Sequence, residues 1–160
     1  MIDDRRQAFV ERYGGIYEHS PWVANLAWER GPDAADDELA ALLAECVDSA
    51  SRQRKLQLIR AHPDLAGRAA VAGDLTSSST AEQASAGLDR CTPEEYEQLN
   101  LLNERYREKF GFPFVMAVTG SSPGQVIRAF ERRLANDREA EFETAISEIH
   151  KIARLRLEAL

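Results

Sequence analysis

The most reactive position that the sequence suggests is a histidine at the end of a predicted helix. Residues 60–67 read RAHPDLAG, so His62 follows an amphipathic helical segment and precedes Pro63. Histidine titrates closest to neutrality of all side chains, so it can donate or accept a proton. Pro63 disfavours a helical conformation at His62 and gives the imidazole a reproducible direction. His62 is therefore either a proton-transfer group or a histidine that closes a helix and hydrogen-bonds a carbonyl.

A second group of candidates lies at the start of another predicted helix. The run Ser79-Thr80-Ala81-Glu82-Gln83 fits a capping box, in which Ser79 caps the helix and Glu82 bonds back to the backbone. The free amides and positive dipole end of a helix N-terminus favour an anionic ligand. The pattern predicts either a purely structural helix start or a polar cluster that contains Glu82.

The last predicted helix carries an arginine on its apolar face. At about 100° per residue, Arg156 falls within an apolar stripe, whereas Arg154 points away from it. The stripe consists of Phe142, Ala145, Ile146, Ile149, Ile152, Ala153 and Leu160. Because a guanidinium cannot become neutral, Arg156 needs anionic or carbonyl partners. The partner is either a structural carboxylate or a substrate anion, and the sequence leaves both open.

Residues 110–118, FGFPFVMAV, form an apolar run that contains a glycine and a proline. The run is too broken for a helix interior and too apolar for a free loop, so it predicts a buried extended segment. Unpaired amides and carbonyls in such a segment can also recognise a planar ligand rich in hydrogen-bonding groups.

Helical periodicity and capping signals account for most of the chain, and strand signals are nearly absent. Ser20, Thr92 and Ser122 each precede a proline and are expected to cap helices, and Gly111 is expected to end one. Either Asp36 or Asp37 is expected to cap a further helix. The predicted helices begin near residues 5, 21, 37, 51, 79, 93, 123 and 138. The sequence thus predicts an all-α fold, a single compact multi-helix domain over residues 1–160 with substantial loops at 61–78 and 111–121.

Composition excludes several classes of protein. The 160 residues carry a net charge of −7, which disfavours binding to nucleic acid. No apolar run approaches the roughly 20 residues of a membrane span, and neither end resembles a targeting signal. Cys46 and Cys91 lack metal-site spacing, and no phosphate loop or nucleophile elbow is present. We therefore expect a cytoplasmic protein with no metal, no nucleic acid and no membrane contact.

Four segments together resemble the OHCU decarboxylase family. They are HPDLAG at 62–67, SSTAEQASAGL at 78–88, LNERYREKFGFPFV at 102–115 and EIHKIARLRL at 148–157. The resemblance covers essentially the whole chain. It implies decarboxylation of 2-oxo-4-hydroxy-4-carboxy-5-ureidoimidazoline to (S)-allantoin in uric acid degradation, by a cofactor-free, all-α enzyme that is usually a homodimer.

The resemblance also assigns roles to residues. It implies catalytic roles for His62, Glu82 and Arg156. The implied substrate-binding residues are Pro63, Ser79, Thr80, Ala81, Glu82, Gln83, Phe114, Val115, Met116, Ala117 and Val118. Loss of CO2 leaves an electron pair that needs an acceptor, and the ring C=N bond next to the carboxylated carbon can take it. The protein then has to orient the carboxylate, stabilise anionic charge and deliver a proton.

Two alternatives remain at this point. One is an enzyme of the same fold that acts on a different ureido acid. The other is a non-catalytic helical module that binds allantoin-like molecules without turnover. Substrate profiling would reveal the first, and thermal stabilisation by allantoin-like molecules without turnover would reveal the second. The family's chemistry implies that spontaneous decay of the substrate gives racemic allantoin, so the chirality of the product tests for catalysis.

Overall fold

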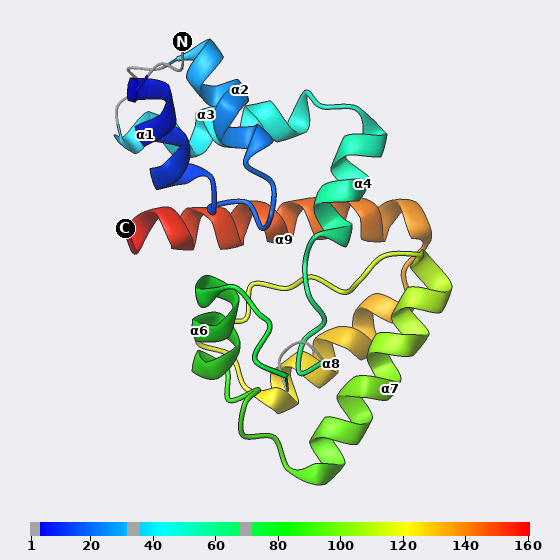
Figure 1. Cartoon of the computed structure of the whole chain (residues 1–160). Helices are drawn as coiled ribbons and strands as arrows, with labels where there is room; N and C mark the ends of the chain where they lie inside the picture. The colour runs from blue at the N-terminus through cyan, green and yellow to red at the C-terminus, as the bar shows by residue number, and fades with distance from the viewer. Residues whose placement is uncertain (1–3, 32–35, 68–71) are drawn as a thin grey trace. The chain divides into compact units, whose positions relative to one another are not determined.

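The structure is a computed structural model that describes residues 4–31, 36–67 and 72–160, with only the backbone described at 36 and 37. These residues form α-helices and irregular segments and no strand, which confirms the all-α prediction. The helices are α1 (Asp4–Tyr13), α2 (Trp22–Arg30), α3 (Asp36–Asp48), α4 (Arg52–Arg60), α6 (Ser77–Ser85), α7 (Pro93–Phe110), α8 (Pro123–Leu134) and α9 (Arg138–Glu158) (Figure 1).

The chain divides into two compact units. The terminal unit comprises Met1–Ala61 and Ile149–Leu160, and the central unit comprises His62–Glu148. The boundary at residue 149 falls inside α9, so this helix contributes its first part to the central unit and its last part to the terminal unit.

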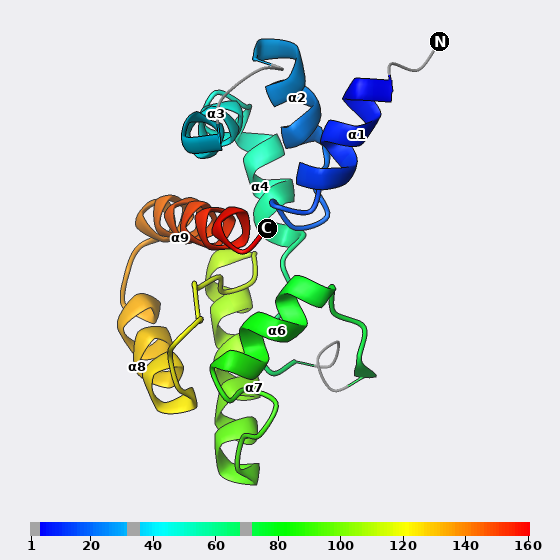
Figure 2. The same ribbon diagram turned by 90° about the vertical axis from the view of Figure 1, so that its left-hand side faces the viewer.

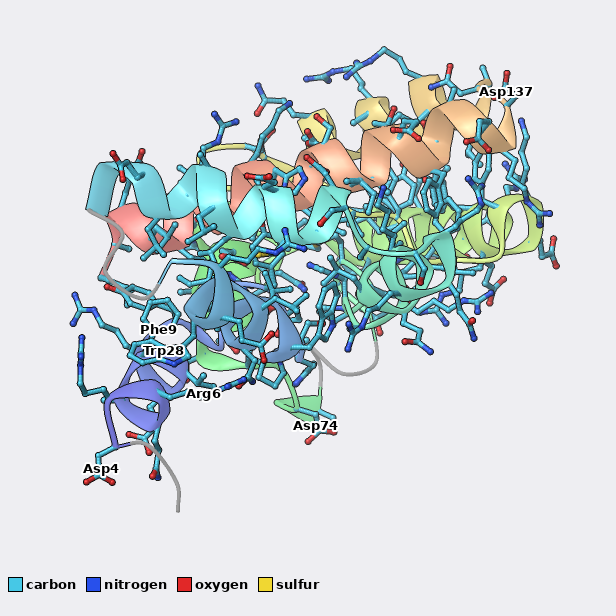
Figure 3. The ribbon with its side chains drawn as sticks, turned by 90° about the horizontal axis from the view of Figure 1, so that it is seen from above. Asp4, Arg6, Phe9, Trp28, Asp74 and Asp137 are labelled. Atoms are coloured by element: carbon cyan, nitrogen blue, oxygen red, sulfur yellow. The ribbon has the colours of Figure 1, made fainter. Side chains whose placement is uncertain are left out.

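In the terminal unit, α1 packs on α2 and α2 packs on α3 (Figure 2). Phe9 of α1 and Trp28 of α2 lie with their ring centroids 5.4 Å apart. Arg6 donates from the same face of α1 to Asn25 at 3.2 Å and to Glu29 at 3.1 Å, and Figure 3 shows its side chain beside this aromatic pair. Apolar contact at the centre and polar contact at the rim join the first two helices.

In the central unit, α7 and α8 lie side by side (Figure 1). Tyr106 is fully buried, and its ring contacts Phe110, Phe112, Phe114 and Phe130 at centroid distances of 4.5–6.2 Å. Two of these rings come from the segment after α7, which is buried as the apolar run predicts. The aromatic cluster therefore fixes an irregular segment against two helices.

Most capping predictions in the central unit are confirmed. Thr92 and Glu95 form a reciprocal capping box, and Ser122 accepts a hydrogen bond from the amide of Gln125. Gly111 ends α7 with a φ of +78°, a left-handed conformation that glycine adopts without steric cost.

Three local predictions are wrong. Ser20 does not cap α2, since its hydroxyl donates to the carbonyl of Glu18 at 2.8 Å. Ser79 does not cap α6 either, because Thr76 accepts the capping bond from the amide of Ser79. The apolar stripe of the last helix was expected to include Leu160, but Leu160 follows the end of α9 and is 59% exposed. The structure does not describe the side chains of Asp36 and Asp37, so the cap expected there is not tested. Residues 68–71 of the first loop also lie outside the described residues.

Candidate active site

His62 follows the C-terminal end of α4 and is the first residue of the central unit. Its helix begins at a cap, where Ser51 accepts from the amide of Arg54, and ends at Arg60. The imidazole is buried, with 7% of the residue exposed. Pro63 is half-buried beside it. The proline break therefore places a histidine inside the protein rather than at its surface.

The loop after His62 is held by neutral side chains. Gln83 accepts from the amide of Ala66 at 3.0 Å and donates to the carbonyl of Asp64 at 3.2 Å. Asn103 of α7 donates to the carbonyl of Leu65 at 3.0 Å. These bonds satisfy backbone groups that burial would otherwise leave without partners. The loop that leads away from His62 is thus fixed at three successive residues.

Two features of the same loop explain residues of the HPDLAG motif. Ala66 has a φ of +54°, a left-handed conformation that non-glycine residues keep only where the surroundings enforce it. A Cβ atom at Gly67 would lie 2.7 Å from the Cβ of Asp64, so a larger residue would push the loop apart. The motif therefore encodes a tight turn directly after the candidate acid–base group.

Helix α6 distributes the predicted substrate-binding residues over two faces. Ser79 and Gln83, four residues apart, are buried on one face. Thr80 and Ala81 are exposed, and Glu82 is half-buried. Since Gln83 bonds the loop after His62, this helix also serves as a support for that loop.

The segment Phe114–Val118 is buried or half-buried along its length. Its backbone is partly used by side chains of the central unit. The carbonyl of Val115 accepts from Arg133 at 2.6 Å, and the amide of Ala117 donates to Glu148 at 3.2 Å. Met116 lies between these two bonded positions.

Arg156 is buried on α9, with 7% exposed, as its place in the apolar stripe predicts. Its guanidinium donates to the carboxylate of Glu18 at 2.8 Å and to the carbonyl of Gly15 at 3.1 Å. A structural carboxylate therefore pairs with it, which is one of the two alternatives that the sequence left open. Glu18 is 2% exposed.

Glu18, the buried partner of Arg156, was not identified from the sequence. It lies in a turn between α1 and α2 that carries no periodicity, among 27 acidic residues in the chain. The signal that pointed to it was indirect, because an arginine on an apolar face requires a buried acidic partner.

The predicted residues are shared between the two units. His62, Pro63, Ser79–Gln83 and Phe114–Val118 belong to the central unit, and Arg156 belongs to the terminal unit. A cavity of about 520 Å³ in the central unit is lined by Ala66, Thr80 and Gln83, together with Leu88, Cys91 and Tyr96. Its volume suits a small molecule, and it includes two of the predicted substrate contacts.

Other kinds of chemistry have little support in the described part of the chain. In these residues no group of three or more histidine, cysteine or acidic side chains is placed to hold a metal ion. Burial raises the pKa of the Cys46 and Cys91 thiols, which disfavours the thiolate form that a nucleophile needs. Among the same residues, no helix is long and apolar enough to cross a membrane.

Comparison with known proteins defines the class. The model of the OHCU decarboxylase family matches residues 4–158. The chain is 49% identical over 156 residues to the 2-oxo-4-hydroxy-4-carboxy-5-ureidoimidazoline decarboxylase of Haloferax volcanii, covering 98% of this chain and 89% of the relative. It is 47% identical over 163 residues to the enzyme of the same name from Halalkalicoccus jeotgali, covering 99% and 90%.

Solved structures agree. A crystal structure of (S)-allantoin synthase superposes with a TM-score of 0.76 at 32% identity, over 96% of this chain and 50% of that chain. A crystal structure of OHCU decarboxylase in the presence of (S)-allantoin shares the fold, with a TM-score of 0.71 at 23% identity, over 85% of this chain and 87% of that chain. The protein belongs to the OHCU decarboxylase family.

Proposed function

We propose that this protein decarboxylates 2-oxo-4-hydroxy-4-carboxy-5-ureidoimidazoline to (S)-allantoin, a step of uric acid degradation. The observation that supports it most directly is the full-length match to the family, combined with a buried histidine on a fixed loop. A buried imidazole at the start of a fixed loop can deliver a proton to one face of a planar intermediate, which is what a chiral product requires.

The proposed roles follow from the chemistry. Departure of CO2 leaves an electron pair, which the adjacent ring C=N bond accepts. His62 transfers the proton, and Glu82, a half-buried acid on α6, helps to position it. Arg156, which is oriented by Glu18, donates in addition to an anionic or carbonyl oxygen of the substrate. Pro63, Ser79–Gln83 and Phe114–Val118 bind the ring and the ureido group, and no metal or organic cofactor takes part.

The test is the appearance of (S)-allantoin by circular dichroism after addition of freshly prepared substrate. We expect His62→Asn to lower kcat by about 10²–10⁴-fold, the usual contribution of a general acid or base. Asparagine keeps a hydrogen-bonding group but cannot carry the proton.

The matched control is His19→Asn. His19 has an exposed side chain and a φ of +46°, which asparagine tolerates, so this variant should keep wild-type activity. Formation of only racemic allantoin by the wild-type protein would refute the function. A chiral signal that survives His62→Asn would remove His62 from the reaction.

We further propose a cytoplasmic homodimer built from a single domain over residues 1–160. The family resemblance supports this assembly. Light scattering on the purified protein tests it, and a monomeric mass at micromolar concentration would contradict it.

A further inference from the structure

Met116 sits at the middle of the proposed substrate-binding segment, between two peptide groups that are each held by a side chain. Arg133 of α8 donates to the carbonyl of Val115 at 2.6 Å. Glu148 of α9 accepts from the amide of Ala117 at 3.2 Å. The first bond fixes the peptide plane before Met116, and the second fixes the plane after it.

Arg133 is itself held in place. Its Nε donates to Glu141 at 2.8 Å, and its guanidinium carbon lies 4.2 Å from the centroid of the Phe114 ring. Glu141 is fully buried, and it also accepts from Tyr106 at 2.6 Å and from Asn136 at 3.0 Å. The planar fork of arginine allows these contacts together, and a lysine could not reproduce them.

The geometry of the peptide group determines where the amide and the carbonyl of Met116 point once these two bonds are made. In a trans peptide the C=O and N–H point in opposite directions, and the described residues contain no cis bond. With the Val115 carbonyl turned toward Arg133, the amide of Met116 points away from Arg133. With the Ala117 amide turned toward Glu148, the carbonyl of Met116 points away from Glu148.

The backbone amide and carbonyl of Met116 are the two polar groups that lie between these fixed positions. Neither its amide nor its carbonyl has a hydrogen-bond partner within residues 4–31, 36–67 and 72–160. The residue is half-buried, where an unsatisfied amide or carbonyl is costly. One donor and one acceptor from a single residue match the neighbouring N–H and C=O of a urea or of a cyclic amide.

We propose that Arg133 and Glu148 are positioning residues that orient the two peptide planes around Met116, so that its backbone amide and carbonyl bind the ureido or ring-amide edge of the substrate. This inference rests on the proposed function. Neither side chain needs to touch the substrate. Their effect is on binding, because hydrogen bonds to an unchanged amide edge form equally in the ground state and the transition state.

The experiment measures kcat, KM and the Kd for (S)-allantoin in Arg133→Met and Glu148→Ala. We expect KM and Kd to rise roughly tenfold in each variant, the equivalent of one or two hydrogen bonds, with kcat nearly unchanged. Glu148→Gln should restore near wild-type values, since a carboxamide oxygen also accepts from the amide of Ala117.

Matched controls lie one residue from Arg133 and five residues from Glu148. Arg132→Met on α8 and Glu143→Ala on α9 remove the same charges at exposed positions, so KM and Kd should not move. Leu43→Ala in the terminal unit removes a buried side chain and should lower stability without raising KM.

Several results would overturn the inference. They are an unchanged KM and Kd in Glu148→Ala, a tenfold rise in the Leu43→Ala control, or a fall in kcat alone in both variants. If Arg133→Met does not fold, the contrast between Glu148→Ala and Glu148→Gln decides the question. A wild-type protein that makes no (S)-allantoin refutes the proposed function, whereas an active wild type with unaffected variants refutes only this inference.

Discussion

Arg133 in the central unit and Arg156 in the terminal unit are two arginines in closely similar settings. Each has little exposed surface, and each donates to a buried glutamate at 2.8 Å and to a backbone carbonyl. The family resemblance assigns catalysis to Arg156 and nothing to Arg133. Burial and a glutamate partner therefore do not distinguish the two arginines, and only their proposed roles differ.

The two glutamates join different parts of the molecule. Glu141 accepts from three donors on three residues, Tyr106, Arg133 and Asn136. Glu18 accepts from Arg156 through its carboxylate, and its backbone carbonyl accepts from the hydroxyl of Ser20 in the same turn. The central cluster joins α7, α8 and α9, and the terminal pair joins α9 to the turn between α1 and α2.

The largest expected effect concerns stability when either glutamate is removed. Glu141→Ala and Glu18→Ala each leave a buried guanidinium without its carboxylate, which costs about 3–5 kcal/mol. Glu141→Ala also removes the acceptor of Tyr106 and Asn136. Urea unfolding followed by circular dichroism measures both, with the exposed Glu143→Ala as the control. A Glu18→Ala protein as stable as the wild type would show that the terminal pair contributes nothing to the fold.

The next effect concerns activity and separates the two arginines. Arg156→Lys should lower kcat by about 10²–10³-fold, as expected when a donor to developing negative charge is misplaced. Arg133→Lys should leave kcat within a few-fold of the wild type and raise KM. Equal losses of kcat in the two variants would contradict the division of roles between the units.

A smaller effect is an alkaline loss of stability to which both units contribute. Burial is the main cause that raises the pKa of Tyr17 and Tyr106 above 10.0, reinforced by Asp48 for Tyr17 and by the hydrogen bond to Glu141 for Tyr106. Above pH 10 the unfolded chain has lost protons that the folded protein keeps. Stability is therefore complete below pH 10 and falls by about 1.4 kcal/mol per pH unit for each tyrosine above it.

Urea unfolding at several pH values from about 9 to 11 measures this slope. Tyr106→Phe and Tyr17→Phe should each remove about half of it, and the double variant should remove nearly all of it. A slope that neither substitution changes would place the alkaline sensitivity elsewhere.

The smallest expected effect concerns an exposed ion pair on the loop after His62. Arg107 donates to Asp64 at 2.8 Å, with the Arg107 side chain 53% exposed. Solvent and salt screen such pairs, so Arg107→Gln should cost less than about 1 kcal/mol. A larger loss, measured by the same unfolding assay, would mean that this pair, rather than Gln83 and Asn103, holds the loop.

Much of the fold was predictable because its signals are local. The capping box at Thr92, the cap at Ser122 and the left-handed Gly111 depend on residues within a few positions of one another. The burial of Arg156 followed from the helical period alone. Where several capping residues stand in a row, as in Thr76-Ser77-Ser78-Ser79, the local signal is degenerate, and the prediction chose the wrong one.

The sequence by itself determined the helical class, most helix ends and the residues that resemble the family's site. Only the tertiary structure decided which side chains hold these residues and their backbone in place. Glu18 and Arg156 are 138 residues apart, Gln83 and Ala66 are 17 apart, and Arg133 and Val115 are 18 apart. Such partners are selected by burial, since an unpaired charge or amide inside the protein is costly wherever its partner lies in the chain. No periodicity in the sequence indicates which distant residue becomes the partner.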